Sequence, residues 1–227
     1  MNIRETTLEA SMSLDKDETG KGFDAQLCEQ LLEHLDNEIE LQLPRLHHQN
    51  AAEEFKNEFL ENQEPIIPGS AMFDQMEYEQ WLVLNTNNRN ENTVNSGWVV
   101  ATTFFAVRKH DQKIVGMMDV RHSLGNKFLS EYGGHLGYSV RPSERKKGYA
   151  TEMLKMGFEY AKSLGIEKLM IACFADNIPS IKTIEKCGGT LSETKPYIEQ
   201  KHINLPDTDG KNVHVFWIDL NSSGIKN

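Results

Sequence analysis

The residues best suited to chemistry lie in one glycine-containing hexapeptide, Arg145–Ala150, whose first three residues are basic. It follows a strand-like run, His135–Val140, and precedes a pattern of apolar residues at helical spacing that ends near Leu164. The free N–H groups and the dipole of a first helical turn favour negative charge, and Gly148 lets a ligand approach the backbone closely. The hexapeptide therefore predicts a binding site for the phosphate groups of a small anionic ligand.

A basic turn before a helix is more often a solvated loop than a binding site, so the residues that follow decide the interpretation. Lys168–Phe174 has the composition of a buried strand, and Asp176 and Asn177 then precede a short helical pattern through Ile184. A Cys-Gly-Gly stop begins at Cys187. Strand, basic loop, helix, strand, asparagine and short helix in this order form a specific constellation.

The run Val140–Ala150 resembles the acyl-CoA signature of the GNAT acetyltransferase superfamily: Arg or Gln, two residues, Gly, one residue, then Gly or Ala. Asn177–Ser180 and Glu185–Gly189 resemble the next element of that family, an asparagine-led helix that ends in glycine. The resemblance is strong over 114–191, extends more weakly over 98–220, and fades in the first part of the chain. It implies an α/β fold with N-terminal helices and a mixed, mostly antiparallel central sheet that contains a splayed parallel strand pair.

The resemblance also implies a function, an N-acetyltransferase that moves an acetyl group from acetyl-CoA to a primary amine of a small molecule or protein by direct attack. The pantetheine arm of acetyl-CoA would lie between the splayed strands, and its pyrophosphate would bind the basic hexapeptide. The residues that the resemblance assigns to this cofactor are Tyr138, Ser139, Val140, Arg145, Lys146, Lys147, Gly148, Tyr149, Ala150, Thr151, Asn177 and Ser180.

Acetyl transfer from a thioester to an amine requires a deprotonated amine, a stabilised oxyanion and a leaving thiolate. In the family that the sequence resembles, a backbone N–H of the third strand polarises the carbonyl group, which points to Tyr138 or Ser139 here. Many members also carry a tyrosine, which protonates the thiolate, at the position of Ile184. In this chain another residue or water would replace that tyrosine, or the thiolate would leave without help.

The general base has several candidates: His135 and Glu131 near the start of the third strand, and His122 or Asp119 on the strand before it. A histidine titrates in the right range without help. Against this, a histidine at a strand end is more often structural, and a loop glutamate is usually solvated. Arg121 together with His122 is an alternative anchor for a carboxylate of the substrate.

The departure at Ile184 keeps a second function open, a non-catalytic acyl-CoA-binding or sensor domain. A third interpretation is an interaction module for nucleic acid or protein built on residues 141–147. The formal net charge of −10 disfavours it, because nucleic-acid binding needs a basic footprint. Binding of acetyl-CoA would separate the first two functions from the third, and release of the CoA thiol in the presence of amines would separate an enzyme from a sensor.

The composition indicates the setting and the partners. No apolar run approaches the ~20 residues that cross a bilayer, and the first residues lack the apolar region of a signal peptide, so a cytoplasmic protein with no membrane partner is expected. The three cysteines, Cys28, Cys173 and Cys187, lack metal-ligand spacing, so no metal site is predicted. The expected partner is the amine acceptor and not a nucleic acid; a homodimer stays open, because dimers are common in the family.

The first part of the chain shows helical patterns. Leu27, Leu31, Leu35 and Ile39 at fourfold spacing predict a helix that begins at Asp24 and is ended by Pro44, and a second helix is expected over 51–60. Asp74 with Glu77 resembles a capping box that opens a third helix. The asparagine-rich run Asn85–Asn95 is expected to be an exposed loop.

From residue 98 onward the pattern predicts strands over 98–108, 114–121, 135–140, 168–174 and 213–220. The first three would form a meander, and a helix over 150–164 would cross over, so that the fourth strand can pair in parallel with the third. The expected organisation is a helical section, residues 1–95, with a flexible start and packed on the core, followed by an acyl-CoA-binding core, residues 96–227.

Overall fold

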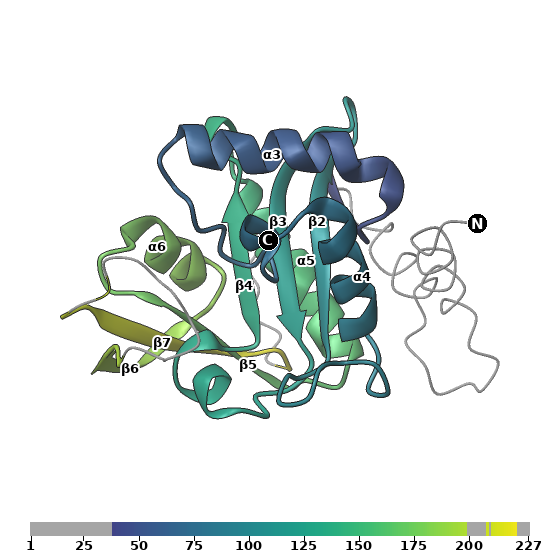
Figure 1. Ribbon diagram of the computed structural model, residues 1–227. Helices are drawn as coiled ribbons and strands as arrows, with labels where there is room; N and C mark the ends of the chain where they lie inside the picture. Colours follow the sequence, from purple (N-terminus) through teal and green to yellow (C-terminus); the bar gives the residue numbers. More distant parts are fainter. Residues whose placement is uncertain (1–37, 199–207, 209, 222–227) are drawn as a thin grey trace.

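The computed structural model describes residues 38–198, 208 and 210–221 of the 227-residue chain (Figure 1). Its larger sheet contains four strands, paired antiparallel in the order β1-β2-β3-β4. Their bounds are Ile39–Gln42 for β1, Ala101–Arg108 for β2, Ile114–Arg121 for β3 and Leu136–Val140 for β4. β2 and β3 are buried along almost their whole length, which explains their nearly continuous apolar sequences.

A second antiparallel sheet has the strand order β5-β7-β6. The bounds are Lys168–Phe174 for β5, Thr190–Pro196 for β6 and Asn212–Asp219 for β7. The sheets meet just before β4, where the N–H of His135 donates to the carbonyl oxygen of Met170 at 2.8 Å. Beyond this contact β5 pairs with β7, so the expected splay of β4 and β5 is confirmed, and the two strands form no ladder within the described residues.

Helices cover both faces of the larger sheet, with α3 and α4 on one face and α5 on the other (Figure 1). The bounds are Gln49–Glu61 for α3, Tyr78–Asn88 for α4, Tyr149–Ser163 for α5 and Ile178–Lys186 for α6. Strand β2 contributes to both layers: Phe104 and Ala106 pack with the α5 side, and Phe105 and Val107 pack with α3 and α4. This division follows from the alternation of side chains along a strand.

Short turns complete the framework: the 3-10 segments Leu46–His48, Phe73–Gln75 and Pro142–Glu144, and one π-helical turn, Leu129–Gly133. α5 begins after Gly148, which has a φ of 95°, and ends before Gly165, which has a φ of 79°. Both glycines occupy left-handed conformations that other residues seldom adopt. Within the described residues, no helix combines the length and the apolar character that a bilayer crossing requires.

The helix predicted from Asp24 to Pro44 is wrong in its last part, because Ile39–Gln42 forms β1 and Ile39 pairs with Arg108 of β2. Residues 24–37 lie outside the described part of the chain. Ile39, Leu41 and Leu43 are buried while the residues between them are more exposed, which is the period of two expected for a strand. Ile39 and Leu43 also continue the fourfold spacing of the leucines before them, so the two patterns competed.

Two expectations around α4 are corrected. Its N-cap is Glu77, so Asp74 does not open the helix; Asp74 lies in the preceding 3-10 turn and accepts a hydrogen bond from Ser70 Oγ at 2.7 Å. The asparagine-rich run is not wholly an exposed loop, because α4 extends to residue 88 and buries Asn85 and Asn88. The pattern of composition favoured a loop, whereas packing on β2 extends the helix.

The other predicted elements agree closely with the structure. α3 contains the helix expected over 51–60, β3 and β5 have the predicted bounds, and β7 shows the expected alternation, with Val213 and Val215 on one side and Phe216 and Ile218 on the other. β2 begins three residues later than predicted, at Ala101. Strand β6 was not predicted. The division of the chain near residue 95 stays a prediction.

Candidate active site

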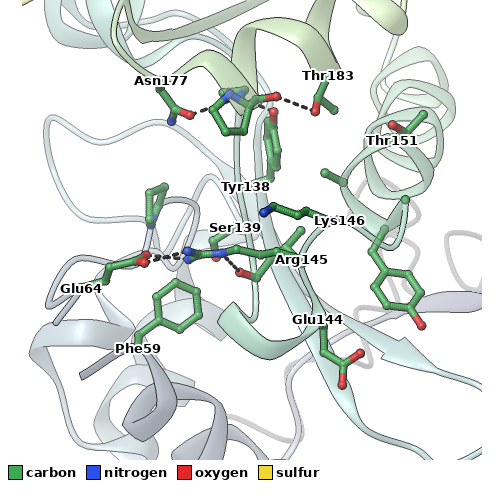
Figure 2. Close-up of a pocket in the computed structure, with 17 residues that line it drawn as sticks. Phe59, Glu64, Tyr138, Ser139, Glu144, Arg145, Lys146, Thr151, Asn177 and Thr183 are labelled. Atoms are coloured by element: carbon green, nitrogen blue, oxygen red, sulfur yellow. Dashed lines mark hydrogen bonds and ion pairs between the residues drawn. The ribbon is translucent and has the colours of Figure 1, made fainter. Parts of the chain in front are cut away.

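A cleft of about 450 Å³ opens where β4 and the second sheet diverge (Figure 2). Its walls are β4, residues 141–148, which we call the phosphate loop, the first turns of α5 and α6, and the end of α3. All of the residues assigned to the cofactor from the sequence line this cleft except Lys147. The lining residues that the sequence did not indicate are Phe59, Glu64, Pro68, Glu144, Pro179 and Thr183.

β4 turns an open backbone edge toward the cleft. The N–H of Arg141, just after the strand, donates to β3 at 2.8 Å. Because hydrogen-bonding groups alternate along an antiparallel strand, those of Gly137 and Ser139 also face β3, whereas those of Tyr138 and Val140 face the cleft. The carbonyl oxygen of Val140 accepts a hydrogen bond from the phosphate loop at 3.2 Å. The remaining edge can pair with an extended, amide-containing ligand.

The phosphate loop leads into α5 through two residues with positive φ, Lys146 at 64° and Gly148 at 95°. This local conformation turns the loop into the N-terminus of α5, whose first N–H groups lack helical partners. A Cβ on Gly148 would meet nothing within 4 Å, so the space above the helix terminus is open. The combination of free N–H groups, helix dipole and open space suits a phosphate group.

Glu144 anchors the loop from beneath. Its buried carboxylate accepts hydrogen bonds from Arg108 Nη1 at 2.8 Å, Lys113 Nζ at 2.7 Å and Lys147 Nζ at 2.8 Å. Burial alone would raise the pKa of Glu144, but the hydrogen bonds from Lys113 and Lys147 outweigh it and lower the pKa to about 2. Lys147 is therefore committed to Glu144, which explains why it does not line the cleft.

The guanidinium of Arg145 forms two hydrogen bonds with the carboxylate of Glu64, at 2.7 and 2.6 Å (Figure 2). It also lies over the ring of Phe59, 5.6 Å from the centroid. Lys146 extends into the cleft in Figure 2 and has no ion-pair partner within the described residues. Of the three basic side chains, Arg145 and Lys147 are therefore paired with carboxylates, whereas Lys146 is not paired within the described residues.

The first turn of α6 forms the opposite wall. The side chain of Asn177 accepts a hydrogen bond from Ser180 N at 3.2 Å and so caps the helix. Tyr138 reaches this turn from β4, and its hydroxyl lies 3.0 Å from Ser180 Oγ. Burial raises the pKa of Tyr138 to about 12, so its hydroxyl stays protonated near neutral pH. Ile184 is fully buried and does not line the cleft.

None of the predicted general bases lines the cleft. His135 is buried, accepts a hydrogen bond from Met170 N through Nδ1 at 3.0 Å, and has its pKa lowered by burial and then by Arg121. Glu131 lies in the π-helical turn, partly exposed, with Lys127 Nζ at 3.9 Å. Both residues nevertheless lie next to the start of β4 and the junction of the sheets.

The candidates on β3 and just after it are held in other interactions. His122 Nε2 lies 3.0 Å from Thr102 Oγ1, and burial lowers the pKa of His122 to about 4. Asp119 is buried. It accepts a hydrogen bond from Thr103 Oγ1 at 2.8 Å and forms an ion pair with Arg121 Nε at 2.8 Å. These contacts hold the side chains of Asp119 and His122, and neither residue lines the cleft.

The two described cysteines lie near this cleft without lining it. Cys173, on β5, is half-buried, and burial raises its pKa to about 11. Cys187, after α6, is buried, and burial raises its pKa as well. Within the described residues, no group of His, Cys, Asp and Glu side chains is arranged to hold a metal ion.

Comparison with known proteins gives a family match. Residues 43–190 match the model of the acetyltransferase (GNAT) domain. A curated relative, the uncharacterized N-acetyltransferase YnaD of Bacillus subtilis (strain 168), is 29% identical over 70 residues, which cover 30% of this chain and 41% of the relative. The chain thus matches well under half of that relative's length.

Solved acetyltransferase structures share the fold. MccE, the microcin C7 self immunity acetyltransferase in complex with acetyl-CoA and AMP, has a TM-score of 0.56 and 20% identity over 81% of this chain and 93% of that one. RimJ of Mycobacterium smegmatis, in complex with CoA-disulfide, has a TM-score of 0.55 and 17% identity, and the match covers 80% of this chain and 81% of RimJ. An N-acetyltransferase from Staphylococcus aureus Mu50 has a TM-score of 0.55 and 16% identity, and the match covers 81% of this chain and 99% of that one.

Proposed function

This chain belongs to the GNAT family of acetyltransferases, and from that premise we propose that it transfers an acetyl group from acetyl-CoA to the nitrogen of an amine. One observation carries the proposal: a single cleft brings together the open edge of β4, the N-terminus of α5 and the capped first turn of α6. The edge of β4 provides partners for amide groups, and the N-terminus of α5 provides partners for phosphate groups. The first turn of α6 provides partners for a polar chain between them.

Each wall of the cleft has a role in holding the donor. The pyrophosphate would bind at the first turn of α5, where Gly148 leaves the backbone accessible and Lys146 supplies positive charge. The pantetheine arm would pair with the outward-facing backbone groups of Tyr138 and Val140, much as a neighbouring strand would. Asn177 would keep the opposite wall in place by capping α6.

The transfer forms a C–N bond from the lone pair of the amine and breaks the C–S bond, whose electron pair goes to sulfur. The backbone N–H of Tyr138 faces the cleft and is the proposed donor to the oxyanion that develops on the carbonyl group. Glu131 and His135 remain the proposed acceptors of the amine proton, because they lie beside the start of β4. His122 is the weakest of the three, since its Nε2 is hydrogen-bonded to Thr102.

The acceptor is proposed to be a small-molecule amine or a protein amino group. A homodimer and a cytoplasmic location likewise stay predictions from the sequence. The non-catalytic acyl-CoA sensor suggested by Ile184 gains no support from the family match, which is to an acetyltransferase domain.

Calorimetry with acetyl-CoA, followed by mass-spectrometric detection of acetylated products across an amine panel, tests the proposal. Binding together with product supports an enzyme, binding without product across the panel would favour a sensor, and absence of binding would exclude both. A Gly148→Glu variant should abolish binding, because it places bulk and negative charge at the helix terminus. Gly165→Glu is the matched control, since Gly165 also has a positive φ and open space around it but lies at the other end of α5.

A further inference from the structure

The cleft proposed for a polyanionic donor carries a carboxylate on its wall. Glu64 lines the cleft and accepts hydrogen bonds from Arg145 Nη1 on Oε1 at 2.7 Å and from Nη2 on Oε2 at 2.6 Å. Hydrogen bonds from Arg145 lower the pKa of Glu64, so the carboxylate is ionised at neutral pH. By Coulomb's law this charge repels an anionic ligand, so its presence at this place calls for a compensating role.

The ion pair of Glu64 with Arg145 connects two walls of the cleft. Glu64 follows α3, and Arg145 belongs to the phosphate loop, 81 positions along the chain. Beyond the two bonds to Glu64, the guanidinium lies over Phe59 and donates through Nε to the carbonyl oxygen of Val140 at 3.2 Å. Arg145 is therefore fixed by contacts with α3, with the segment after α3 and with the end of β4. Bidentate carboxylate pairs of this kind restrict geometry as well as adding energy.

A second carboxylate, that of Glu58 in α3, holds the other end of the same loop. Glu58 forms a hydrogen-bonded ion pair with Arg141 Nε, and it accepts a second hydrogen bond from Ser143 N at 2.7 Å. Residues 141–145, which lead into the proposed phosphate site, are thus attached at one end to α3, through Glu58, and at the other to the segment that follows α3, through Glu64. Glu144 holds the loop from beneath.

We propose that Glu64 is a positioning residue for donor binding, which holds Arg145, and through it the phosphate loop, in the conformation that receives acyl-CoA. The inference rests on the proposed function and deepens it. Arg145 contributes through the position of its backbone and not as a free charge, and the free charge of the loop is that of Lys146.

The sign of one mutational effect distinguishes this role from simple electrostatics. Glu64→Gln removes a negative charge from an anion-binding cleft, so charge alone predicts tighter binding of acetyl-CoA. Loss of positioning predicts the opposite, a Kd about two- to fivefold higher, from the usual strength of a partly exposed ion pair. At saturating acetyl-CoA, kcat should be unchanged, because Glu64 does not act on the reacting atoms.

The experiment measures the Kd of acetyl-CoA by calorimetry for the wild type, Glu64→Gln, Arg145→Ala and the double variant. In the Arg145→Ala background, Glu64→Gln should lower the Kd, since only the repulsion is left to remove. Glu61→Gln is the control: Glu61 is exposed at the end of α3, three residues before Glu64, and the variant removes the same charge without breaking a pair with the loop. Its Kd should be equal to or slightly below that of the wild type.

A Kd for Glu64→Gln that is unchanged or lower than that of the wild type overturns the positioning role. An equal rise in both backgrounds also overturns it, because the effect would not pass through Arg145. Melting curves confirm folding, and Glu64→Asp, which keeps the charge but shortens the side chain, serves as a second variant that should also weaken binding. Absence of binding by the wild type would instead overturn the proposed function, so the two failures are distinguishable.

Discussion

The three basic side chains of the phosphate loop have three different surroundings. Arg145 pairs with Glu64 and Lys147 with Glu144, whereas Lys146 has no carboxylate partner in the part of the chain that the structure describes. Free positive charge in the cleft is therefore a property of one residue. Residue type alone did not distinguish it from its neighbours.

Lys146→Ala should raise the KM for acetyl-CoA about tenfold, because it removes a charge-assisted hydrogen bond worth about 1.5–3 kcal/mol. Lys147→Ala should change that KM by less than about twofold and lower the melting temperature instead, since buried Glu144 loses one of its partners. Steady-state kinetics and melting curves measure both effects. An equal rise in KM for the two variants would show that Lys147 does not stay paired with Glu144 in solution.

The residues of the site that could be predicted are those that a local backbone conformation requires. Gly148 is required by a left-handed turn and Asn177 by a helix cap, and both requirements can be recognised from a few neighbouring residues. Phe59 and Glu64 come from a distant part of the chain and reach the cleft only because α3 packs on the sheet. No local pattern marks such residues, so the sequence did not indicate them.

At the scale of elements, the segment between α3 and α4 lies against the backbone of β4. Gly69 has a φ of 75°, and a Cβ there would lie 2.3 Å from the carbonyl oxygen of Gly137 and 2.7 Å from Tyr138 N. The indole N–H of Trp81 holds the segment by donating to the carbonyl oxygen of Ser70 at 2.9 Å. The segment therefore fixes the position of the strand that carries the proposed oxyanion donor.

Gly69→Ala should lower the free energy of unfolding by roughly 2 kcal/mol or more, and kcat by about tenfold, because β4 must shift away from the new methyl group. Gly97→Ala is the matched control, since Gly97 has a φ of 82° but nothing within 4 Å of its Cβ position. The control should show only the backbone strain, about 1 kcal/mol, and a normal kcat. Urea unfolding and initial rates test the pair; similar losses of kcat would contradict the proposed role of β4.

Elements with a strong apolar pattern were predictable, and those with a weak or mixed one were not. β3 and β5 are short, largely apolar runs bounded by turns, and α3 carries buried residues at helical spacing. β6 is exposed at nearly every position, so it has no alternation to detect, and its pairing with β7 supplies the order. β1 is short and follows a leucine pattern of a different period, and only pairing with β2 decides its conformation.

At the scale of the whole molecule, two histidines, buried His48 and partly buried His122, link stability to pH. Burial lowers the pKa of His48 and of His122 to about 4, from an ordinary value of 6.5. Between these values the unfolded chain binds more protons than the folded one. The stability associated with the neutral rings is thus fully present above pH 6.5 and is lost progressively as the pH falls toward 4.

The free energy of unfolding should therefore fall by about 3 kcal/mol per histidine between pH 7 and pH 4, because one pKa unit corresponds to about 1.4 kcal/mol. Urea unfolding at a series of pH values measures the slope. His122→Gln should flatten it, whereas His110→Gln, which changes an exposed side chain on a turn, should leave it as in the wild type. An unaltered slope in His122→Gln would contradict a neutral, partly buried His122.

Burial of the two thiols beside the cleft has a practical consequence. With raised pKa values, Cys173 and Cys187 are almost entirely protonated at the mildly alkaline pH at which thiol-reactive dyes are used. A dye therefore reacts much faster with a small, solvated thiol such as liberated CoA than with either of these side chains. Continuous colour development can follow turnover with little background from them, and maleimide labels can be directed to cysteines introduced elsewhere.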